Sequence, residues 1–292
     1  MSAEAATHAL GGKWSGRRGV AFCPVHENTR TPALSLADGE DGKLLVKCFA
    51  GCDAVDVLRE LNRRGLGVAD IRVRPKQKPE CRILDRRNFA MKLWCEAYPV
   101  QDTLADQYLR ERGIRPPFPA SLRFHPLLQH TLSQMRHPAM IGLVTIGKCN
   151  EAIGIHRTFL APDARKAHVM PCKMMLGNCG GGAVRLSDAG DGPIVICEGI
   201  ETGLSLRDAL AFEEPAPRVW AALSTSGISG IRVPFPQAAI VVAPDGDLPG
   251  HRSAEALAAR AKAEGCDVRI MAAPAGQDWN DVARGMALKV SQ

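Results

Sequence analysis

The chain has 292 residues, of which 46% are hydrophobic and 23% charged, and its formal net charge is +6. This length suits a small module plus a larger core, about two or three folded units, and the positive charge favours a polyanionic partner. Without a signal peptide or a long apolar run, the sequence excludes a membrane span and predicts a cytoplasmic protein. In a reducing cytosol, paired cysteines among the ten are expected to bind metal rather than to form disulfides.

The amino-terminal part of the chain contains two close pairs of metal-ligand residues. Residues 1–18 are small, polar and basic, which predicts a flexible arm. Two ligands a few positions apart can reach one ion from a single turn, and two such turns complete the tetrahedron of a structural zinc site. The sequence offers these pairs as Cys23 with His26 and Cys48 with Cys52.

The segment between the ligand pairs has the pattern of a β-hairpin. Residues 33–36 and 43–48 alternate apolar and polar side chains, and a Gly-rich turn at 39–42 lies between them. Residues 54–61 predict a closing helix. We therefore expect residues 19–66 to form a zinc ribbon.

A basic segment follows the zinc ribbon. Residues 67–82 show no apolar periodicity and predict a linker. Between Arg72 and Lys92, eight basic residues stand against Glu80 and Asp85. Two interpretations remain open: a solvated tether, or a strip that contacts phosphates and becomes ordered when nucleic acid binds.

Residues 83–188 predict an α+β subdomain. Segments 89–98 and 103–112 have helical patterns, and segments 140–146 and 152–157 predict two paired strands. Residues 189–292 instead alternate strand and helix, which predicts a doubly wound parallel sheet. The expected strands are 194–197, 218–223, 239–242 and 267–271, and the expected helices are 201–211 and 249–264. A Ser/Gly segment at 224–230 is a candidate loop for cradling a phosphate.

Carboxylates follow directly on two of these apolar strands. Glu198 comes after the first strand, and Asp245 and Asp247 come after the third. Acidic residues just beyond the carboxyl ends of parallel strands meet at one sheet edge, where open α/β folds build their sites. Hard oxygen ligands without histidine suit Mg²⁺.

The other acids of this region are less clear from the sequence. Asp278 and Asp281 form a third acidic group, which we call the third acidic station. Glu201 is an acid at the start of a predicted helix, and we expect it to contribute little to the site. The alternative interpretation of all these acids is solvated acidic loops.

These residues resemble the Toprim domain, which bacterial-type primases, topoisomerases, some nucleases and recombination mediators share. The resemblance rests on Glu198-Gly199 and on Asp245-x-Asp247, each after a hydrophobic strand, and it covers roughly residues 190–285. It implies that Glu198 acts as acid, base or metal ligand and that the two aspartates bind Mg²⁺ or Mn²⁺.

The amino-terminal segment resembles the Cys-His-Cys-Cys zinc-binding domain of bacterial-type DNA primases. The matching stretches are Phe22-Cys-Pro-Val-His26, Thr31-Pro-Ala-Leu-Ser35 and Cys48-Phe-Ala-Gly-Cys52. The middle part resembles the amino-terminal half of the primase core through Gly154-Ile-His-Arg157 and a downstream lysine. This implies contacts from Arg157, and from Lys166 or Lys173, to template or nucleotide phosphates.

Together the resemblances imply an α/β protein of the compact plasmid and phage type: a Toprim-type parallel sheet flanked by helices, an α+β primase-core subdomain before it, and a small amino-terminal zinc ribbon. The implied activity is template-directed synthesis of short RNA primers on single-stranded DNA from NTPs, with a replicative helicase as a further partner. A non-catalytic replication or conjugation accessory protein and a Toprim nuclease are the alternatives.

Overall fold

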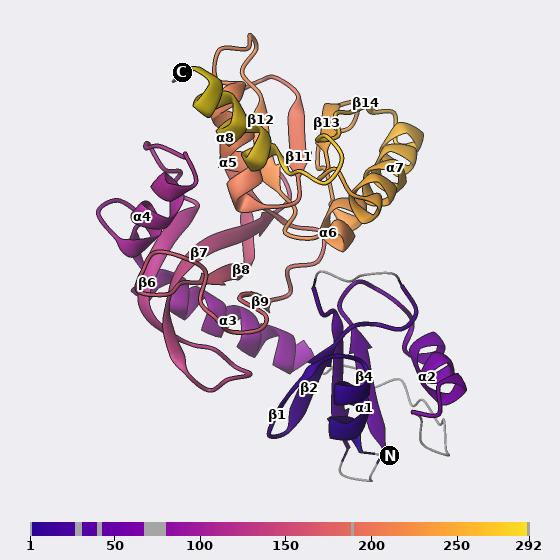
Figure 1. Cartoon of the computed structure of the whole chain (residues 1–292). Helices are drawn as coiled ribbons and strands as arrows, with labels where there is room; N and C mark the ends of the chain where they lie inside the picture. Colours follow the sequence, from indigo (N-terminus) through magenta and orange to yellow (C-terminus); the bar gives the residue numbers. More distant parts are fainter. Residues whose placement is uncertain (1, 27–30, 40–42, 67–79, 188–189, 291–292) are drawn as a thin grey trace. The chain divides into compact units, whose positions relative to one another are not determined.

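The computed structural model describes residues 2–26, 31–39, 43–66, 80–187 and 190–290, with side chains left out at 80–84 and 286–290 (Figure 1). They form two compact units. The smaller contains Met1–Lys78, Gln129–Met135 and Val169–Pro171, and the larger contains the rest. Of the predicted linker at 67–82, residues 67–79 lie outside the described residues. None of the described helices has the length and apolar composition that crossing a membrane requires.

The smaller unit is a four-stranded antiparallel sheet with two helices. Its elements are α1 (Ala3–Ala9), β1 (Lys13–Ser15), β2 (Arg18–Ala21), β3 (Leu34–Asp38), β4 (Leu44–Cys48) and α2 (Ala54–Arg63), and the strands follow one another in the sheet. The predicted hairpin is confirmed as β3 and β4, with Leu36 opposite Val46. The predicted closing helix is confirmed as α2, which is two residues longer than expected.

The prediction of a flexible arm at residues 1–18 is wrong. Residues 3–9 form α1, whose Ala3 and Ala6 are fully buried, and the Ala3 amide donates to the Asp38 carboxylate at 2.8 Å. The small side chains that suggested a loose segment are what allow close packing against the sheet. Gly19 on β2 is part of this fit, because a Cβ there would overlap the Thr7 side chain.

The larger unit is built on one ten-stranded mixed sheet. Its strand order is β14-β13-β11-β12-β10-β7-β6-β5, and β8 pairs with β7 and β9. The strands are β5 (Tyr98–Pro99), β6 (Leu122–Gln129), β7 (Arg136–Ile146), β8 (Glu151–Phe159), β9 (Lys173–Gly177), β10 (Ala183–Ser187), β11 (Ile194–Cys197), β12 (Arg218–Ala221), β13 (Ala239–Ala243) and β14 (Asp267–Ile270). The two regions that we expected at 83–188 and 189–292 therefore share a sheet, through the antiparallel pair β10–β12.

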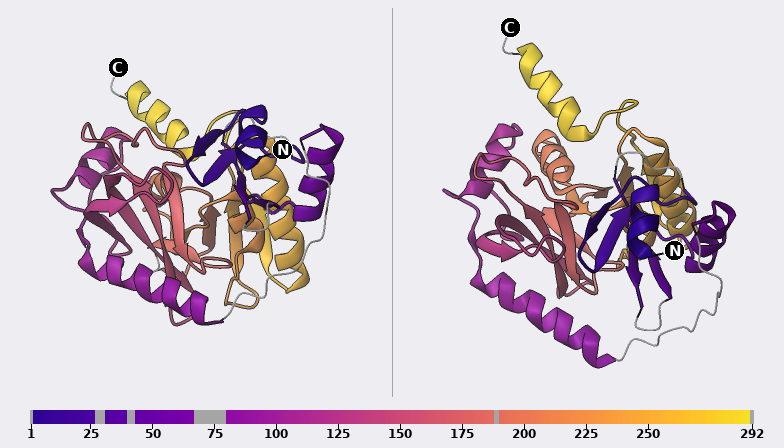
Figure 2. Two further views of the ribbon diagram at one scale, coloured as in Figure 1. Left: turned by 90° about the horizontal axis from the view of Figure 1, so that it is seen from below. Right: turned by 60° about the horizontal axis from the view of Figure 1, so that its bottom comes forward.

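Helices cover both faces of this sheet. They are α3 (Glu80–Glu96), α4 (Leu104–Glu111), α5 (Ile200–Ala209), α6 (Thr225–Gly230), α7 (Leu248–Ala263) and α8 (Trp279–Val290). Helix α3 packs along β8 and β9, and α7 packs on β13 and β14, as Figure 2 also shows. Alternate residues of β11 enter different cores: Val195 and Cys197 pack with α5, and Ile194 and Ile196 pack with α6 and α7.

The parallel strands create a topological switch point. β11, β12, β13 and β14 are parallel, but β12 lies on one side of β11 and β13 lies on the other. The chain therefore runs outward through α5 to β12 and then crosses back to β13. Connections that leave in opposite directions open a crevice at the carboxyl ends of β11 and β13, which is where open α/β sheets bind ligands.

Two segments differ from their predicted structure. The first helix of the larger unit begins at Glu80 rather than at residue 89, so residues 80–82 belong to a helix instead of a linker. The Ser/Gly segment 224–230 is helix α6 rather than a loop. The Ser224 hydroxyl accepts the Gly227 amide at 2.9 Å and begins the helix, which is what serine does at an N-cap.

Candidate functional site

Three carboxylates lie at the switch point. Cys197 at the end of β11 is paired with Ala243 at the end of β13, so Glu198 and Asp245 leave the sheet at the same edge. Asp247 is the N-cap of α7, and its carboxylate accepts the Gly250 amide at 2.8 Å. Two rigid strands and one capped helix therefore fix the backbone positions of the three acids that the sequence singled out.

These carboxylates carry negative charge that the described residues do not fully neutralise. Burial, followed by the charges of Asp245 and Asp247, raises the pKa of Glu198 to about 7. Burial, followed by Asp278 and Asp247, raises the pKa of Asp245 to about 6. The Oδ1 atom of Asp245 is buried and has no hydrogen-bond partner among the residues that the structure describes. A buried acceptor without a partner is costly, so this donor set fits a divalent cation.

Asp278 and Asp281 have a structural role beside this site. The Asp281 amide donates to the Asp278 carboxylate at 2.8 Å, and the Asp278 amide donates to the Asp281 carboxylate at 3.3 Å. This reciprocal capping starts α8. Both charges also raise the pKa of Asp245, so the third acidic station adds to the field at the sheet edge.

Glu201 is the centre of a buried polar network that joins three elements. Its side chain is only 7% exposed. Its Oε1 accepts the hydroxyl of Tyr108 from α4 at 2.5 Å, and its Oε2 accepts the ammonium group of Lys173 from β9 at 3.0 Å. Burial opposes ionisation, but the charges of Lys173 and Lys166 outweigh it and hold the pKa of Glu201 far below its ordinary value. Glu201 is therefore more than the helix-start acid that the sequence suggested.

Three cationic side chains lie near the single carboxylate of Glu201. Burial and the charge of Lys173 lower the pKa of Lys166, and Arg112 contributes in the same direction. Arg112, at the end of α4, stacks over the Tyr108 ring with its guanidinium carbon 4.8 Å from the ring centre. We define Lys166, Lys173 and Arg112 as the cationic cluster. The field of Lys173 also reaches Glu198 and Asp245, where it lowers the pKa of both.

Sequence reasoning missed Arg112 and grouped Arg157 with the two lysines instead. In the β8–β9 register, Lys173 is opposite Thr158, whereas Arg157 is opposite Met174. Neighbouring residues of a strand point to opposite faces, so Arg157 and Lys173 lie on different faces of the sheet. Arg157 is buried, donates to the Met175 carbonyl at 3.4 Å, and has its pKa lowered to about 10 by burial and Arg86. The sequence signal that could have identified Arg112 is its position four residues after Tyr108, which places the two side chains next to each other on one helix.

The second candidate metal centre lies in the smaller unit. Cys23, His26, Cys48 and Cys52 bring their ligand atoms within 4.8 Å of one another, and among the described residues they alone form such a group of three or more. The Nδ1 atom of His26 is 3.1 Å from the sulfur of Cys52 and 3.7 Å from that of Cys48. Ordinary Zn–S and Zn–N bonds in a tetrahedron separate such atoms by about 3.6 Å. The predicted ligand quartet is therefore assembled with zinc-like geometry.

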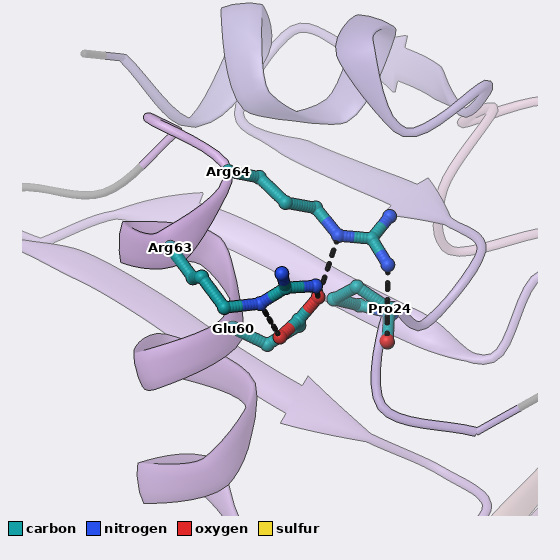
Figure 3. Close-up of polar contacts among 4 residues, drawn as sticks. All are labelled: Pro24, Glu60, Arg63 and Arg64. Carbon is teal, nitrogen blue, oxygen red and sulfur yellow. Dashed lines mark hydrogen bonds and ion pairs between the residues drawn. The ribbon is translucent and has the colours of Figure 1, made fainter.

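A network on α2 supports the first ligand turn, which carries Cys23 and His26. Arg64 donates to the Pro24 carbonyl in this turn at 3.3 Å and to Glu60 at 2.8 Å (Figure 3). Arg63 makes two further bonds to Glu60, at 2.7 and 2.8 Å. Hydrogen bonds from Arg63 and then Arg64 lower the pKa of Glu60 to about 2. The closing helix thus helps to hold the ligand turn in place.

Two domain-family models match the chain. Residues 193–287 match the Toprim domain family, and residues 84–186 match a domain of unknown function, DUF7146. The Toprim resemblance predicted from the sequence is confirmed, as is the α/β fold class. No curated protein matches the sequence.

Solved structures of low sequence identity are similar in fold. The zinc-binding and RNA polymerase domains of the Aquifex aeolicus primase are 14% identical, with a TM-score of 0.45 over 99% of this chain and 80% of that one. A DNA primase domain from Pseudomonas aeruginosa is 14% identical, with a TM-score of 0.42 over 73% and 78%. The primase fragment of the bacteriophage T7 primase-helicase protein is 13% identical, with a TM-score of 0.39 over 96% and 98%.

Proposed function

We propose that this protein is a DNA primase, a nucleotidyltransferase that makes short RNA primers on single-stranded DNA. One observation carries the proposal: the carboxylates of Glu198, Asp245 and Asp247 gather, with unneutralised charge, at the switch point of a Toprim domain. The resemblance of this domain narrows the chemistry to making or breaking phosphodiesters. The zinc-ligand quartet at the amino end favours the primase among these activities.

The carboxylates have distinct roles in this proposal. Asp245 and Asp247, with Glu198, would hold Mg²⁺ or Mn²⁺, which when bound supplies positive charge to the triphosphate and acidifies the attacking hydroxyl. Asp247 is held in place by its bond to the Gly250 amide. The pKa of Glu198, raised to about 7, lets this group accept a proton from a 3′-hydroxyl near neutral pH.

The cationic cluster supplies the complementary charge. Lys166, Lys173 and Arg112 stand against the single carboxylate of Glu201, which leaves an excess of positive charge beside the acids. Phosphate groups of an incoming NTP or of the template would offset that excess. Tyr108 and Glu201 act as positioning residues in this proposal, because Tyr108 contacts Arg112 and Glu201 binds Lys173.

The remaining partners follow from the sequence. The zinc ribbon would bind single-stranded template, and the buried Arg157 is retained as a phosphate contact only through its resemblance to the primase core. Its position on the other face of the sheet from Lys173 separates the two predicted contacts.

Incorporation of labelled ribonucleotides on single-stranded DNA tests the proposal. The wild-type protein with Mg²⁺ or Mn²⁺ and NTPs should yield short RNA products. Asp245→Asn and Asp247→Asn should each reduce the yield at least 100-fold, about 2.7 kcal/mol, because asparagine keeps the shape but removes charge from the cation site. Glu198→Gln should remove most of the product, since it can neither take the proton nor lend charge.

The control for these variants is Glu264→Gln, an equal loss of charge on the exposed end of α7. It should leave synthesis unchanged. Tight DNA binding without product under any template or metal condition would replace the polymerase with an accessory protein. Metal-dependent cutting of the DNA would replace it with a nuclease.

A further inference from the structure

A second group of cations, away from the carboxylates, surrounds a hollow in the larger unit. This pocket has a volume of about 460 Å³ and lies between the β7–β8 turn and the segment after α6. Its lining includes Lys148, Cys149, Glu151, Arg232 and Pro234. Lys148 and Arg232 are exposed, and neither has an ion-pair partner among the described residues. The acid of the lining, Glu151, is bound to Arg87 at 2.9 Å.

An aromatic ring under the pocket holds further cations. The Lys148 ammonium lies 5.8 Å from the centre of the Phe235 ring, and the Arg218 guanidinium lies 4.7 Å from it. Stacking on the face of the Phe235 ring stabilises the Lys148 and Arg218 cations without neutralising them. The pocket therefore keeps a strong positive potential that an anion would offset.

The sheet register connects this pocket to the carboxylates. Cys197 is paired with Ala221, Ala221 with Val184, and Val184 with Val144, so these residues form one row across β11, β12, β10 and β7. β7 runs in the same direction as β11, because it is antiparallel to β10 and β10 is antiparallel to β12. The turn that carries Lys148 thus leaves the same edge as Glu198. Three strand spacings separate Val144 from Cys197 in this row by about 14 Å, and Lys148 lies four residues beyond Val144.

We propose that this pocket binds a backbone phosphate of the nucleic-acid strand held at the carboxylate site, with Lys148 and Arg232 as its contacts. The assignment rests on the proposed function for the identity of the strand. Because the pocket lies at least three strand spacings, about 14 Å or more, from Glu198, the contact is more than one nucleotide away from the reacting end. The contacting side chains are cations that bind phosphate rather than base edges. The contact is therefore expected to be independent of nucleotide sequence.

The exposed thiols provide a direct test of occupancy. Cys149 lines the pocket, and Cys95 is an exposed cysteine on α3 outside the lining. Alkylation of both by a maleimide is followed by mass spectrometry while oligodeoxythymidylate is titrated into the full-length protein. The rate at Cys149 should fall along the DNA-binding curve, and the rate at Cys95 should not change. Equal rates at Cys149 with and without saturating DNA would overturn the proposal.

Paired substitutions test the energetics. Lys148→Ala with Arg232→Ala should weaken oligodeoxythymidylate binding by about 25-fold at 0.1 M salt and make the log–log salt slope shallower by about 1.4, since each contact to single-stranded phosphate contributes about 0.7. The matched control is Lys262→Ala with Arg269→Ala, two exposed cations on α7 and β14 that lose the same charge. The control should leave both quantities nearly unchanged. An equal loss in both variants would show a general charge effect and refute the site.

Further measurements distinguish a failure of the pocket proposal from a failure of the proposed primase function. Binding of a single NTP should be unaffected by the pocket variant, because one nucleotide cannot span the two positions. Primer synthesis with no change in DNA affinity or in Cys149 protection would reject the pocket alone. Absent synthesis with a clear affinity loss would reject the primase alone. Protection of Cys149 by polyglutamate but not by DNA would assign the pocket to an acidic protein instead.

Discussion

The two candidate metal centres of this protein are built in opposite ways. The zinc-ligand quartet gathers its atoms within 4.8 Å, and two of its four residues are buried in the core of a small unit. The carboxylates of Glu198, Asp245 and Asp247 do not meet that closely, and they project from the rigid edge of a ten-stranded sheet. The first arrangement suits an ion that completes the fold, and the second suits one that comes and goes with substrate.

The surroundings of the two centres show the same contrast. Burial and the neighbouring thiols raise the pKa of Cys52 to about 12, so without a cation this thiol keeps its proton. We therefore expect the fold of the smaller unit to depend on an ion bound by the quartet. The carboxylates have Lys173 nearby and large hydrophobic cores beneath them, so the larger unit is expected to fold without metal.

The largest expected effect is the loss of the zinc ligands. Cys48→Ser should abolish zinc binding and unfold the smaller unit, because structural zinc contributes about 10–16 kcal/mol to such folds. Metal analysis should give one zinc per wild-type chain, and limited proteolysis should cut the variant within residues 2–66. The larger unit should keep its unfolding transition.

Cys149→Ser is the control for this substitution, since Cys149 is exposed and lies outside the quartet. It should retain both zinc and protease resistance. Purified wild-type protein without zinc, or a Cys48→Ser variant with full zinc content, would contradict the prediction that the quartet binds a structural zinc ion.

The network around Glu201 should give the next largest effect. Glu201→Gln leaves Lys173 without its counterion, and breaking a buried pair in this way costs about 3–5 kcal/mol. The Lys173 side chain is 33% exposed, so we expect the lower end of that range. Urea unfolding followed by tryptophan fluorescence measures the loss. Combining the change with Lys173→Met should recover most of it, because both charges are then gone.

An exposed pair provides the comparison for this network. Glu264→Gln removes the partner of Arg260, 3.6 Å away at the surface. It should change the unfolding free energy by less than about 0.5 kcal/mol. A similar loss in the two variants would mean that Glu201 is not the buried centre described above.

The sequence revealed those parts of the site that depend on local patterns. Within each pair of the candidate zinc-ligand quartet the residues stand three or four positions apart, and Glu198, Asp245 and Asp247 follow apolar strands. Both groups could therefore be predicted without a fold. The bond from Tyr108 to Glu201 spans 93 positions and that from Lys173 to Glu201 spans 28. Only the packing of α4, α5 and β9 brings these residues together. No periodicity in the sequence could have paired them.

The differences between the sequence-based expectations and the structure have a similar physical origin. Alternation shows that neighbouring strand residues face opposite ways, but it does not show which face lies towards a distant helix. Arg157 was therefore grouped with Lys173, although they lie on different faces. Residues 1–18 looked loose because alanine and glycine carry little apolar area, yet Ala3 and Ala6 are fully buried in the smaller unit.

The pH dependence of stability should distinguish the two centres further. The folded pKa of Asp245, about 6, lies above the ordinary value of about 3.9, so the folded state binds this proton more tightly. Its stabilising contribution is complete below about pH 4 and is lost as the pH rises through 6. Asp245→Asn should consequently stabilise the metal-free larger unit at pH 8 relative to wild type, but not at pH 4.

The expected gain is about 1–2 kcal/mol, less than the full shift implies, because Asp245 is partly exposed and solvent screens its charge. Denaturant unfolding with a chelator of Mg²⁺ measures it, and added Mg²⁺ should stabilise the wild type but not the variant. A variant that is less stable than wild type at pH 8 would show that the Asp245 carboxylate is already neutralised by the protein.

The smallest effect should come from the support of the zinc-ligand turn. Arg64→Ala removes the hydrogen bond to the Pro24 carbonyl, while Arg63 remains to neutralise Glu60. Groups that orient metal ligands typically change metal affinity by about 10- to 100-fold. Arg64 acts on the turn rather than on a ligand atom and its side chain is 45% exposed, so we expect a loss of zinc affinity no larger than about tenfold. Competition with a chromogenic chelator measures it. Arg59→Ala is the matched control, because Arg59 on the same helix bonds Asp56 and, among the described residues, makes no hydrogen bond or ion pair to the ligand turn. Equal affinities for Arg64→Ala and Arg59→Ala would mean that the turn is held by its ion and the sheet alone, without help from α2.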